Sequence, residues 1–312
     1  MRKSIRYLLT LLTAGIFTLE SPTPPASACT AIVLPAQDGS FVYGRTMEWG
    51  TFDLNTRISI IPRGQAFTGA TPDGQPGLSW KAKQGVLGLD MMGKNALADG
   101  MNESGLVVGL LYHPGFAEYQ SYDPKQAGIA ISPQDVAQYI LTQCSTVDDV
   151  RAALEKIRVV PVVEPSLGFA PGVHWIVTEP SGKCIVIEYL KGELSIVDNP
   201  LRILTNAPEF GWHMTNLRNY INLSPVAIPM KKLDDLDFTP LGGGSGMIGL
   251  PGDFTPPSRL IRAVAWTQTA RPTDTAEETI YEIFRILDNF NVPLGASEGS
   301  EAAKALLNSR GY

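Results

Sequence analysis

The sequence has few of the residues that usually carry protein chemistry, with three cysteines and three histidines among 312 residues. Three cysteines are too few for a disulfide framework or a cysteine-rich zinc scaffold. His113, His174 and His213 are scattered without the spacing of metal ligands, so we interpret each as structural or surface-lying and expect no metal or organic cofactor. Charged residues make up 18% of the chain and give a net charge of −6, which argues against a nucleic-acid partner because phosphates require a basic stripe.

The first 28 residues have the pattern of a cleaved secretory signal. Three basic residues within Met1–Arg6 precede an apolar run over 7–19, which is shorter than the roughly 20 residues that span a bilayer. Ala26-Ser27-Ala28 then provides the small residues that signal peptidase accepts. We therefore predict a signal peptide over 1–28 and one mature domain over 29–312, secreted or periplasmic and without stable insertion into a membrane.

Cleavage after Ala28 would make Cys29 the first residue of the mature chain, and three interpretations follow. Acylation would anchor a lipoprotein, although its signal usually carries a large aliphatic residue where Ala26 stands. An incidental cysteine would be buried or paired with Cys144 or Cys184. An N-terminal nucleophile would carry its own base, because a thiol and an α-amino group hold protons with similar strength near neutral pH. That arrangement needs no separate histidine.

Hydrophobic periodicity predicts an α+β domain in which blocks of strands alternate with blocks of helices. Strands are expected over 30–34, 41–47, 57–63, 85–91, 96–101, 106–112, 174–177, 184–189 and 194–197. Helices are expected over 132–144, 146–157, 208–219, 258–269 and 275–290. The glycine-rich segment 240–257 lacks the Lys-Ser/Thr of a phosphate-binding loop, so we predict a mobile loop beside an active site.

Five motifs occur in an order that resembles the choloylglycine hydrolase family, which contains bile salt hydrolases and penicillin V acylases. They are Cys29-Thr30, Tyr43–Trp49, Asp99–Leu106, Leu204–Pro208, and Leu250–Phe254 followed by Ser258-Arg259. The export signal and the Arg-Thr-Met-Glu-Trp sequence look most similar to Gram-negative penicillin acylases. The resemblance implies a cysteine hydrolase that cleaves a linear amide between an apolar acyl group and a polar amine.

The resemblance also implies roles for individual residues. Cys29 would be the nucleophile, and the Arg45 guanidinium would favour its thiolate. Glu48 stands where the family has an aspartate that binds the α-amino group. Asn206 would donate its amide N–H to the oxyanion, and Arg259 would hold the charges of the site. Each of the last four residues also has a structural alternative. They are a surface salt bridge for Arg45, a solvated carboxylate for Glu48, a turn or helix cap for Asn206 and a structural ion pair for Arg259.

Three more residues are assigned to the substrate. Tyr112 is chosen as the second oxyanion donor, in a stretch one residue longer than the family's, and a packing aromatic is the alternative. Bile salt hydrolases have an asparagine as this donor, and the absence of an asparagine at this position therefore favours an acylase. Met47 and Trp49 would line an apolar acyl pocket or pack in the core. Penicillin V is the first predicted substrate, followed by long-chain N-acyl homoserine lactones and conjugated bile salts.

The implied fold is the four-layer αββα sandwich of N-terminal nucleophile hydrolases, and family members are often homotetramers. Relatives continue with further strands beyond 293–297, whereas this sequence ends at Tyr312 after an expected short helix over 302–309. We therefore expect the sheets to lack their last strands and to have exposed edges. The rival interpretation is a lipid-anchored or catalytically inactive binding protein.

Overall fold

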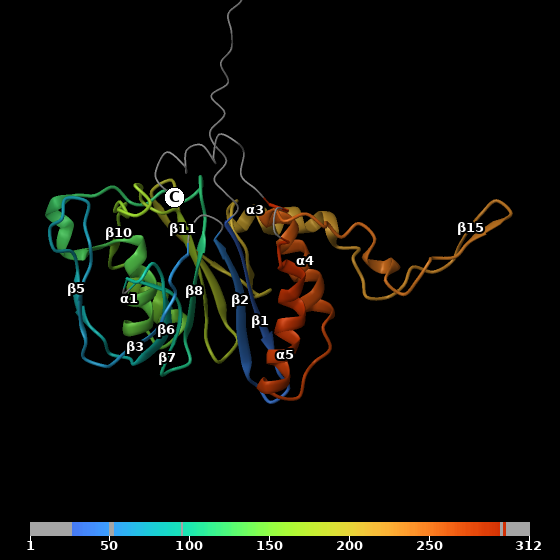
Figure 1. Ribbon diagram of the computed structural model, residues 1–312, viewed down its shortest axis with the longest axis horizontal. Helices are drawn as coiled ribbons and strands as arrows, with labels where there is room; N and C mark the ends of the chain where they lie inside the picture. Colours follow the sequence, from blue (N-terminus) through green and yellow to red (C-terminus); the bar gives the residue numbers. More distant parts are fainter. Residues whose placement is uncertain (1–26, 50–52, 95, 294–295, 298–312) are drawn as a thin grey trace, which may run out of the picture.

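The protein folds into four layers, two sheets packed face to face with helices on both outer sides (Figure 1). The computed structural model describes residues 27–49, 53–94, 96–293 and 296–297. The predicted signal peptide, apart from its last two residues, and the expected helix over 302–309 lie outside the described residues. The order of helix, sheet, sheet and helix confirms the predicted architecture.

The larger sheet has seven antiparallel strands in the order β13-β12-β11-β8-β7-β6-β3. They are β3 (Ile58–Ile61), β6 (Val86–Asp90), β7 (Leu97–Asn102), β8 (Val107–Tyr112), β11 (Val173–Thr178), β12 (Cys184–Leu190) and β13 (Glu193–Asp198). β11 is a run of six buried residues, because layers cover both of its faces.

The smaller sheet has the order β14-β1-β2, with β1 (Ser27–Pro35), β2 (Phe41–Trp49) and β14 (Ile203–Leu204). Helices α4 (Pro256–Thr269) and α5 (Ala276–Leu287) cover its outer face. Gly44 permits the close approach of α5, since a Cβ atom there would lie 2.4 Å from Cγ2 of Ile283. The outer face of the larger sheet is covered by α1 (Val136–Gln143) and α2 (Val147–Leu154).

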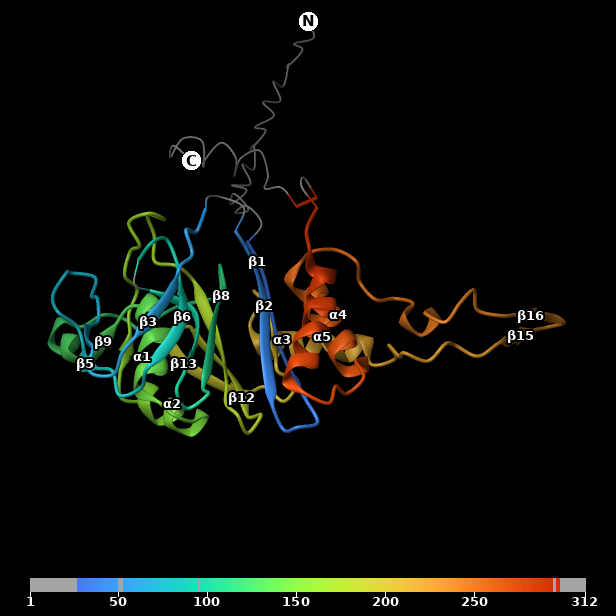
Figure 2. The same cartoon turned by 60° about the horizontal axis from the view of Figure 1, so that its bottom comes forward.

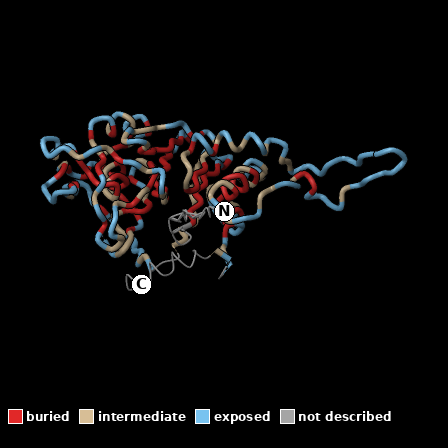
Figure 3. The backbone as a smooth tube through the Cα atoms, turned by 90° about the horizontal axis from the view of Figure 1, so that it is seen from above, coloured by how far each residue is buried: buried red, intermediate tan, exposed pale blue. Residues whose placement is uncertain are grey.

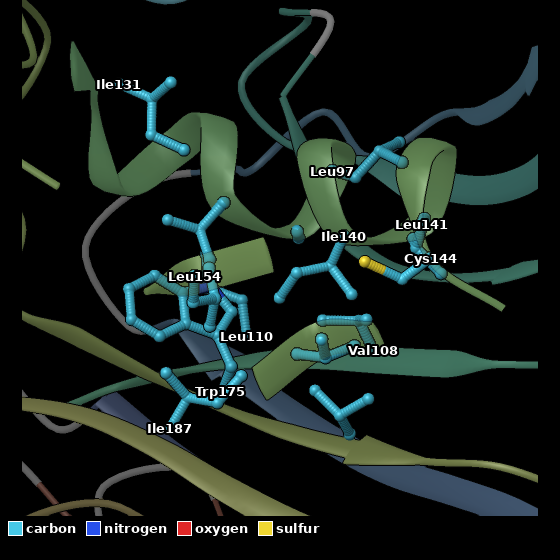
Figure 4. Packing of buried hydrophobic residues seen from close by; sticks show 14 of the residues in the cluster. Leu97, Val108, Leu110, Ile131, Ile140, Leu141, Cys144, Leu154, Trp175 and Ile187 are labelled. Carbon is cyan, nitrogen blue, oxygen red and sulfur yellow. The ribbon is translucent and has the colours of Figure 1, made fainter. Parts of the chain in front are cut away.

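Three hydrophobic clusters fill the spaces between the layers. Figure 4 shows the first, in which Ile140 of α1 and Leu154 of α2 pack above Trp175 of the larger sheet. A second lies under α4 and α5. The third, between the two sheets, contains Cys29 together with Leu111 and other residues. The predicted nucleophile therefore lies in the centre of the sandwich rather than at its surface.

The smaller sheet covers only part of the larger one within the described residues (Figure 2). On β6 the side chains alternate, with Val86 buried and Leu87 exposed on the opposite face. Ile58 and Ile60 of β3 lie on that same open face and are more than 75% exposed. Within the described residues, this apolar face has no covering element, and β2 pairs with β1 alone.

A long arm leaves the body between α3 (Phe210–Leu217) and α4, and most of its residues are exposed (pale blue in Figure 3). Its tip is the hairpin β15 (Lys231–Leu233) and β16 (Leu236–Phe238). The sequence pattern does not predict this hairpin. The glycine-rich segment is the return limb of the arm and the link to α4, and it does not line the pocket described below. Only its end reaches the site, where the Phe254 carbonyl accepts from Arg259 Nε at 3.0 Å and the Pro256 carbonyl accepts from Thr205 Oγ1 at 3.1 Å.

The remaining elements are short. They are β4 (Ala66–Thr68), β5 (Ser79–Lys81), β9 (Ala130–Ile131), β10 (Arg158–Val159), and the 3₁₀ helices η1 (Pro124–Ile129), η2 (Pro133–Asp135), η3 (Arg218–Tyr220), η4 (Ser245–Met247) and η5 (Asp288–Phe290). Among the described residues, none of the helices has the length and apolar character to cross a membrane.

Candidate active site

The antiparallel register of β1 and β2 determines which predicted site residues meet. Cys29 lies opposite Met47, and Ala31 lies opposite Arg45. Because alternate residues of a strand share a face, Cys29, Arg45 and Met47 all face the larger sheet. Glu48 belongs to the alternate set and lies opposite Ala28. The hairpin thus separates the side-chain sulfur and Arg45 on one face from Glu48 on the other.

Asn206 is brought beside Cys29 because β14 pairs with β1 just before it. Its Oδ1 accepts hydrogen bonds from the backbone N–H of Cys29 at 2.8 Å and from Arg259 Nη2 at 2.6 Å. Its Nδ2 donates to the backbone carbonyl of Tyr112 at 2.7 Å. Two donors facing the oxygen and an acceptor facing the nitrogen fix the orientation of the amide. One amide hydrogen of Asn206 remains for another acceptor.

Arg259 on α4 binds the main chain at the nucleophile. It donates from Nη1 to the Cys29 carbonyl oxygen and, at 2.9 Å, to Oγ1 of Thr30. The residue is 1% exposed, and burial lowers the pKa of Arg259 to about 10, so the guanidinium still carries its charge at neutral pH. Arg259 therefore holds Cys29 and Asn206 in one buried arrangement.

Arg45 lies in a buried ion pair with Asp99, whose role the sequence does not predict. Arg45 Nη1 lies 3.0 Å from Asp99 Oδ2 and donates to the Leu110 carbonyl at 2.6 Å. Although burial opposes the charged form, the negative charge of Asp99 raises the pKa of Arg45. The Tyr43 hydroxyl donates to Asp99 at 2.6 Å. These contacts keep a permanent cation next to the sulfur.

Replacing Asp99 with alanine is expected to lower the free energy of unfolding by about 3–5 kcal/mol, because it leaves Arg45 buried without its counter-charge. Chemical denaturation measures the change. Glu282→Ala is the control, since it breaks the Arg285–Glu282 pair, in which Arg285 is 75% exposed, and should cost under about 1 kcal/mol. Equal effects of the two substitutions would contradict a structural role for the buried pair.

Glu48 has a free acceptor close to the nucleophile. Its Oε2 atom is buried and accepts no hydrogen bond from the residues that the structure describes. Burial raises the pKa of Glu48, while a hydrogen bond from Thr46 and the charge of Arg259 oppose that shift. An ammonium group at Cys29 would supply both a charge and a donor for this carboxylate.

A pocket opens at Cys29 and encloses about 660 Å³ of empty space, solvent at its mouth included. Its wall is largely apolar. The lining residues are Cys29, Arg45, Met47, Glu48, Trp49, Leu54, Met91, Met92, Leu110, Tyr112, Gln134, Leu167, Pro171 and Val173. Trp49 and Tyr112 meet edge to face with ring centroids 5.4 Å apart. The predicted pocket residues Met47, Trp49 and Tyr112 thus share one cavity with the predicted nucleophile.

The structure gathers the three histidines, although the sequence scatters them. The rings of His113 and His174 stack with centroids 4.2 Å apart and planes 7° apart. Glu188 Oε1 lies 3.2 Å from His174 Nδ1. A metal ion lies near the plane of each imidazole that binds it. Two parallel, stacked rings offer no shared in-plane position, so this cluster does not have the geometry of a metal site.

The other two cysteines are buried in different places. Cys184 begins β12, as the strand prediction placed it, and Cys144 is the residue directly after α1, although the helix was predicted to include it. Burial raises the pKa of both thiols to about 12, so they stay protonated at neutral pH. No two of the three cysteines are joined by a disulfide. Among the cysteines, only Cys29 lines the apolar pocket.

Comparisons with known proteins agree with this geometry. Residues 29–306 match the family model for linear amide C–N hydrolases, choloylglycine hydrolase family. The chain is 33% identical to a bile salt hydrolase/transferase of Clostridium perfringens over 88% of this chain and 82% of that protein. It is 27% identical to a penicillin V acylase of Pectobacterium atrosepticum over 95% of this chain and 77% of that protein.

Solved structures give the same result. A variant of the conjugated bile acid hydrolase from Clostridium perfringens aligns with a TM-score of 0.72 at 30% identity, over 87% of this chain and 83% of that one. The fold is therefore that of the N-terminal nucleophile hydrolases in this family. The chain belongs to the choloylglycine hydrolase family and is a linear amide C–N hydrolase.

Proposed function

We propose that the protein is an exported cysteine amidohydrolase that cleaves a linear amide between an apolar acyl group and a polar amine through a thioester on Cys29. The observation that carries the proposal is the position of Cys29 in an apolar pocket, flanked by Arg45 and hydrogen-bonded to Asn206. The apolar wall suits the acyl group, and the charged residues at Cys29 suit the reacting amide.

In the proposed reaction the Cys29 sulfur attacks the carbonyl carbon while its proton passes to the α-amino group. The carbonyl oxygen gains negative charge, and the remaining amide hydrogen of Asn206 stabilises it. The intermediate collapses, and the departing amine takes the proton from the α-ammonium group. Water then adds to the thioester through the same base, which releases the acid and restores the thiol. Tyr112 is proposed as the second oxyanion donor.

This reaction requires the removal of residues 1–28. With Ala28 attached, the nitrogen of Cys29 is an amide that cannot accept a proton. The family match begins at Cys29, which supports cleavage at this point. Intact mass of the exported protein tests the proposal: loss of 28 residues without added mass supports the enzyme. A diacylglyceryl adduct would instead support the lipid-anchored interpretation.

A penicillin V acylase-like specificity is our first proposal for the substrate. The aromatic pair Trp49 and Tyr112 in the pocket wall suits an aryl acyl group. Conjugated bile salts are the second candidate, because a relative with that name is 33% identical to this chain. Long-chain N-acyl homoserine lactones share the same division into apolar acyl group and polar amine.

A side-by-side hydrolysis panel tests these candidates. The mature enzyme is incubated with penicillin V, a long-chain N-acyl homoserine lactone and a glycine-conjugated bile salt, and kcat/KM is measured for each. We expect penicillin V to give the highest value. A higher value for either other substrate would contradict the acylase assignment, and no turnover of any would support an inactive binding protein.

We also propose that the protein forms a homotetramer through the exposed arm. An isolated two-stranded hairpin is marginally stable in water, and this one exposes 65% of Leu236 and 52% of Phe238. The double variant Leu236→Asp and Phe238→Asp is expected to be monomeric, whereas the parent elutes as a tetramer in size-exclusion chromatography with light scattering. Lys232→Ala on the same hairpin is the control. A monomeric parent would contradict the proposal.

A further inference from the structure

The loop that carries Asn206 is held from behind by two buried histidines. His174 Nε2 lies 2.9 Å from the backbone oxygen of Thr205, and His213 Nε2 lies 2.9 Å from that of Asn206. His174 belongs to β11 and His213 to α3, so two different elements grip consecutive carbonyl groups. Both histidines are fully buried. On its other side, the Asn206 side chain contacts Cys29 and Arg259.

The acceptors identify the tautomers of both histidines. A carbonyl oxygen only accepts, so each Nε2 carries a proton. His174 Nδ1 faces Glu188 Oε1 at 3.2 Å, so one proton lies between these two atoms. Burial raises the pKa of Glu188 and lowers that of His174 to about 3. The same Glu188 oxygen accepts the Phe210 N–H at the start of α3.

We propose that Glu188, His174 and His213 are positioning residues, which fix the backbone of Thr205 and Asn206 so that the free amide hydrogen of Asn206 faces the carbonyl attacked by Cys29. The inference rests on the proposed function for the identity of that carbonyl. None of the three touches the pocket, so each acts through the loop. Loss of a histidine leaves a buried carbonyl without its donor, and the loop must move to find another.

Two substitutions of His213 that differ in side-chain length test the inference. In His213→Gln the amide nitrogen can occupy the place of Nε2 and donate to the Asn206 carbonyl, whereas the shorter side chain of His213→Asn cannot reach it. Both replacements are neutral amides. We expect His213→Gln to keep kcat within about threefold of the parent, and His213→Asn to lower kcat about 10- to 100-fold with little change in KM. Position 174 offers the same pair, His174→Gln and His174→Asn, should one variant fail to fold.

Two further measurements separate positioning from general damage. The rate of Cys29 alkylation by iodoacetamide should fall much less than kcat in the folded Asn variants, because Arg45 still lies beside the sulfur when the loop moves. Crystal structures of the Gln and Asn variants should show the Asn206 side chain in place in the first and displaced in the second. Unchanged kcat and an undisplaced Asn206 in the Asn variant would overturn the inference, as would an equal loss of alkylation and turnover.

The structural readout also separates this inference from the proposed function. If the parent hydrolyses no substrate while Asn206 moves only in the Asn variant, the hydrolytic proposal fails and the role of the histidines in placing Asn206 stands. If the parent is active and Asn206 never moves, the positioning inference alone fails. Glu188→Ala gives an independent check, since it removes both the partner of His174 Nδ1 and the acceptor of the Phe210 N–H, and should lower kcat with little change in KM.

Discussion

Replacing Cys29 with alanine is expected to lower kcat by at least about 1,000-fold on the best substrate of the hydrolysis panel. The thioester cannot form without sulfur, and the remaining contacts of Arg45, Asn206 and Arg259 supply no nucleophile. Initial rates of product release, followed by chromatography at saturating substrate, measure the loss. Retained hydrolysis would refute the assignment of the nucleophile.

The other two cysteines provide matched controls for this result. Cys144→Ala and Cys184→Ala remove thiols that do not line the pocket. Burial raises the pKa of both thiols to about 12. Each should keep kcat within about twofold once it is folded, as checked by circular dichroism. A loss comparable to that of Cys29→Ala in either control would mean that the missing activity reflects damage to the fold.

A protein that begins at Ala28 is expected to have a kcat about 100- to 10,000-fold below that of one that begins at Cys29, the contribution usual for general acid–base catalysis. The extra residue converts the proposed base into an amide and places Ala28 opposite Glu48, where it is buried. Both proteins keep the same sulfur, so the comparison isolates the α-amino group. Mass spectrometry confirms each N-terminus before the rates are measured.

Thiol titration of the two proteins under native conditions serves as the control for the second prediction. Equal numbers of reactive thiols together with unequal turnover would support the α-amino group as the base. Equal turnover would contradict that role and would require a different proton acceptor. Glu48, whose Oε2 accepts no hydrogen bond from the described residues, would then be the first residue to substitute in the search for that acceptor.

The sequence predicted the main elements because local patterns determine them. The turn residues Gln37-Asp38-Gly39-Ser40 between two expected strands predict the first hairpin, which the structure confirms as β1 and β2. The capping Thr146 begins α2, with its hydroxyl accepting from Asp149, and Thr275 begins α5 in the same way. These signals lie within four residues of the positions that they specify. The apolar faces of the helices then follow from their 3.6-residue period.

The same local signals could not identify Asp99 as the partner of Arg45. The two residues are 54 positions apart and meet only when the two sheets pack, and Gly109 leaves room there for the Tyr43 hydroxyl. The gathering of the histidines is equally non-local, since His174 and His213 come from a strand and a helix. The arm was missed because its strands are three residues long and exposed on both faces, without an alternating pattern.

The sequence by itself identified the candidate nucleophile, through the cleavage pattern that ends at Ala28, and its partner strand, because residue spacing on a hairpin decides which side chains share a face. The order of the layers followed only from the resemblance to the family. The tertiary structure decided what surrounds Cys29. It placed Asn206, which is 177 residues away in the chain, within hydrogen-bond distance, and it buried Arg259 against both. Such contacts depend on the packing of β14 and α4 against β1, and no local pattern specifies the distance between elements that pack.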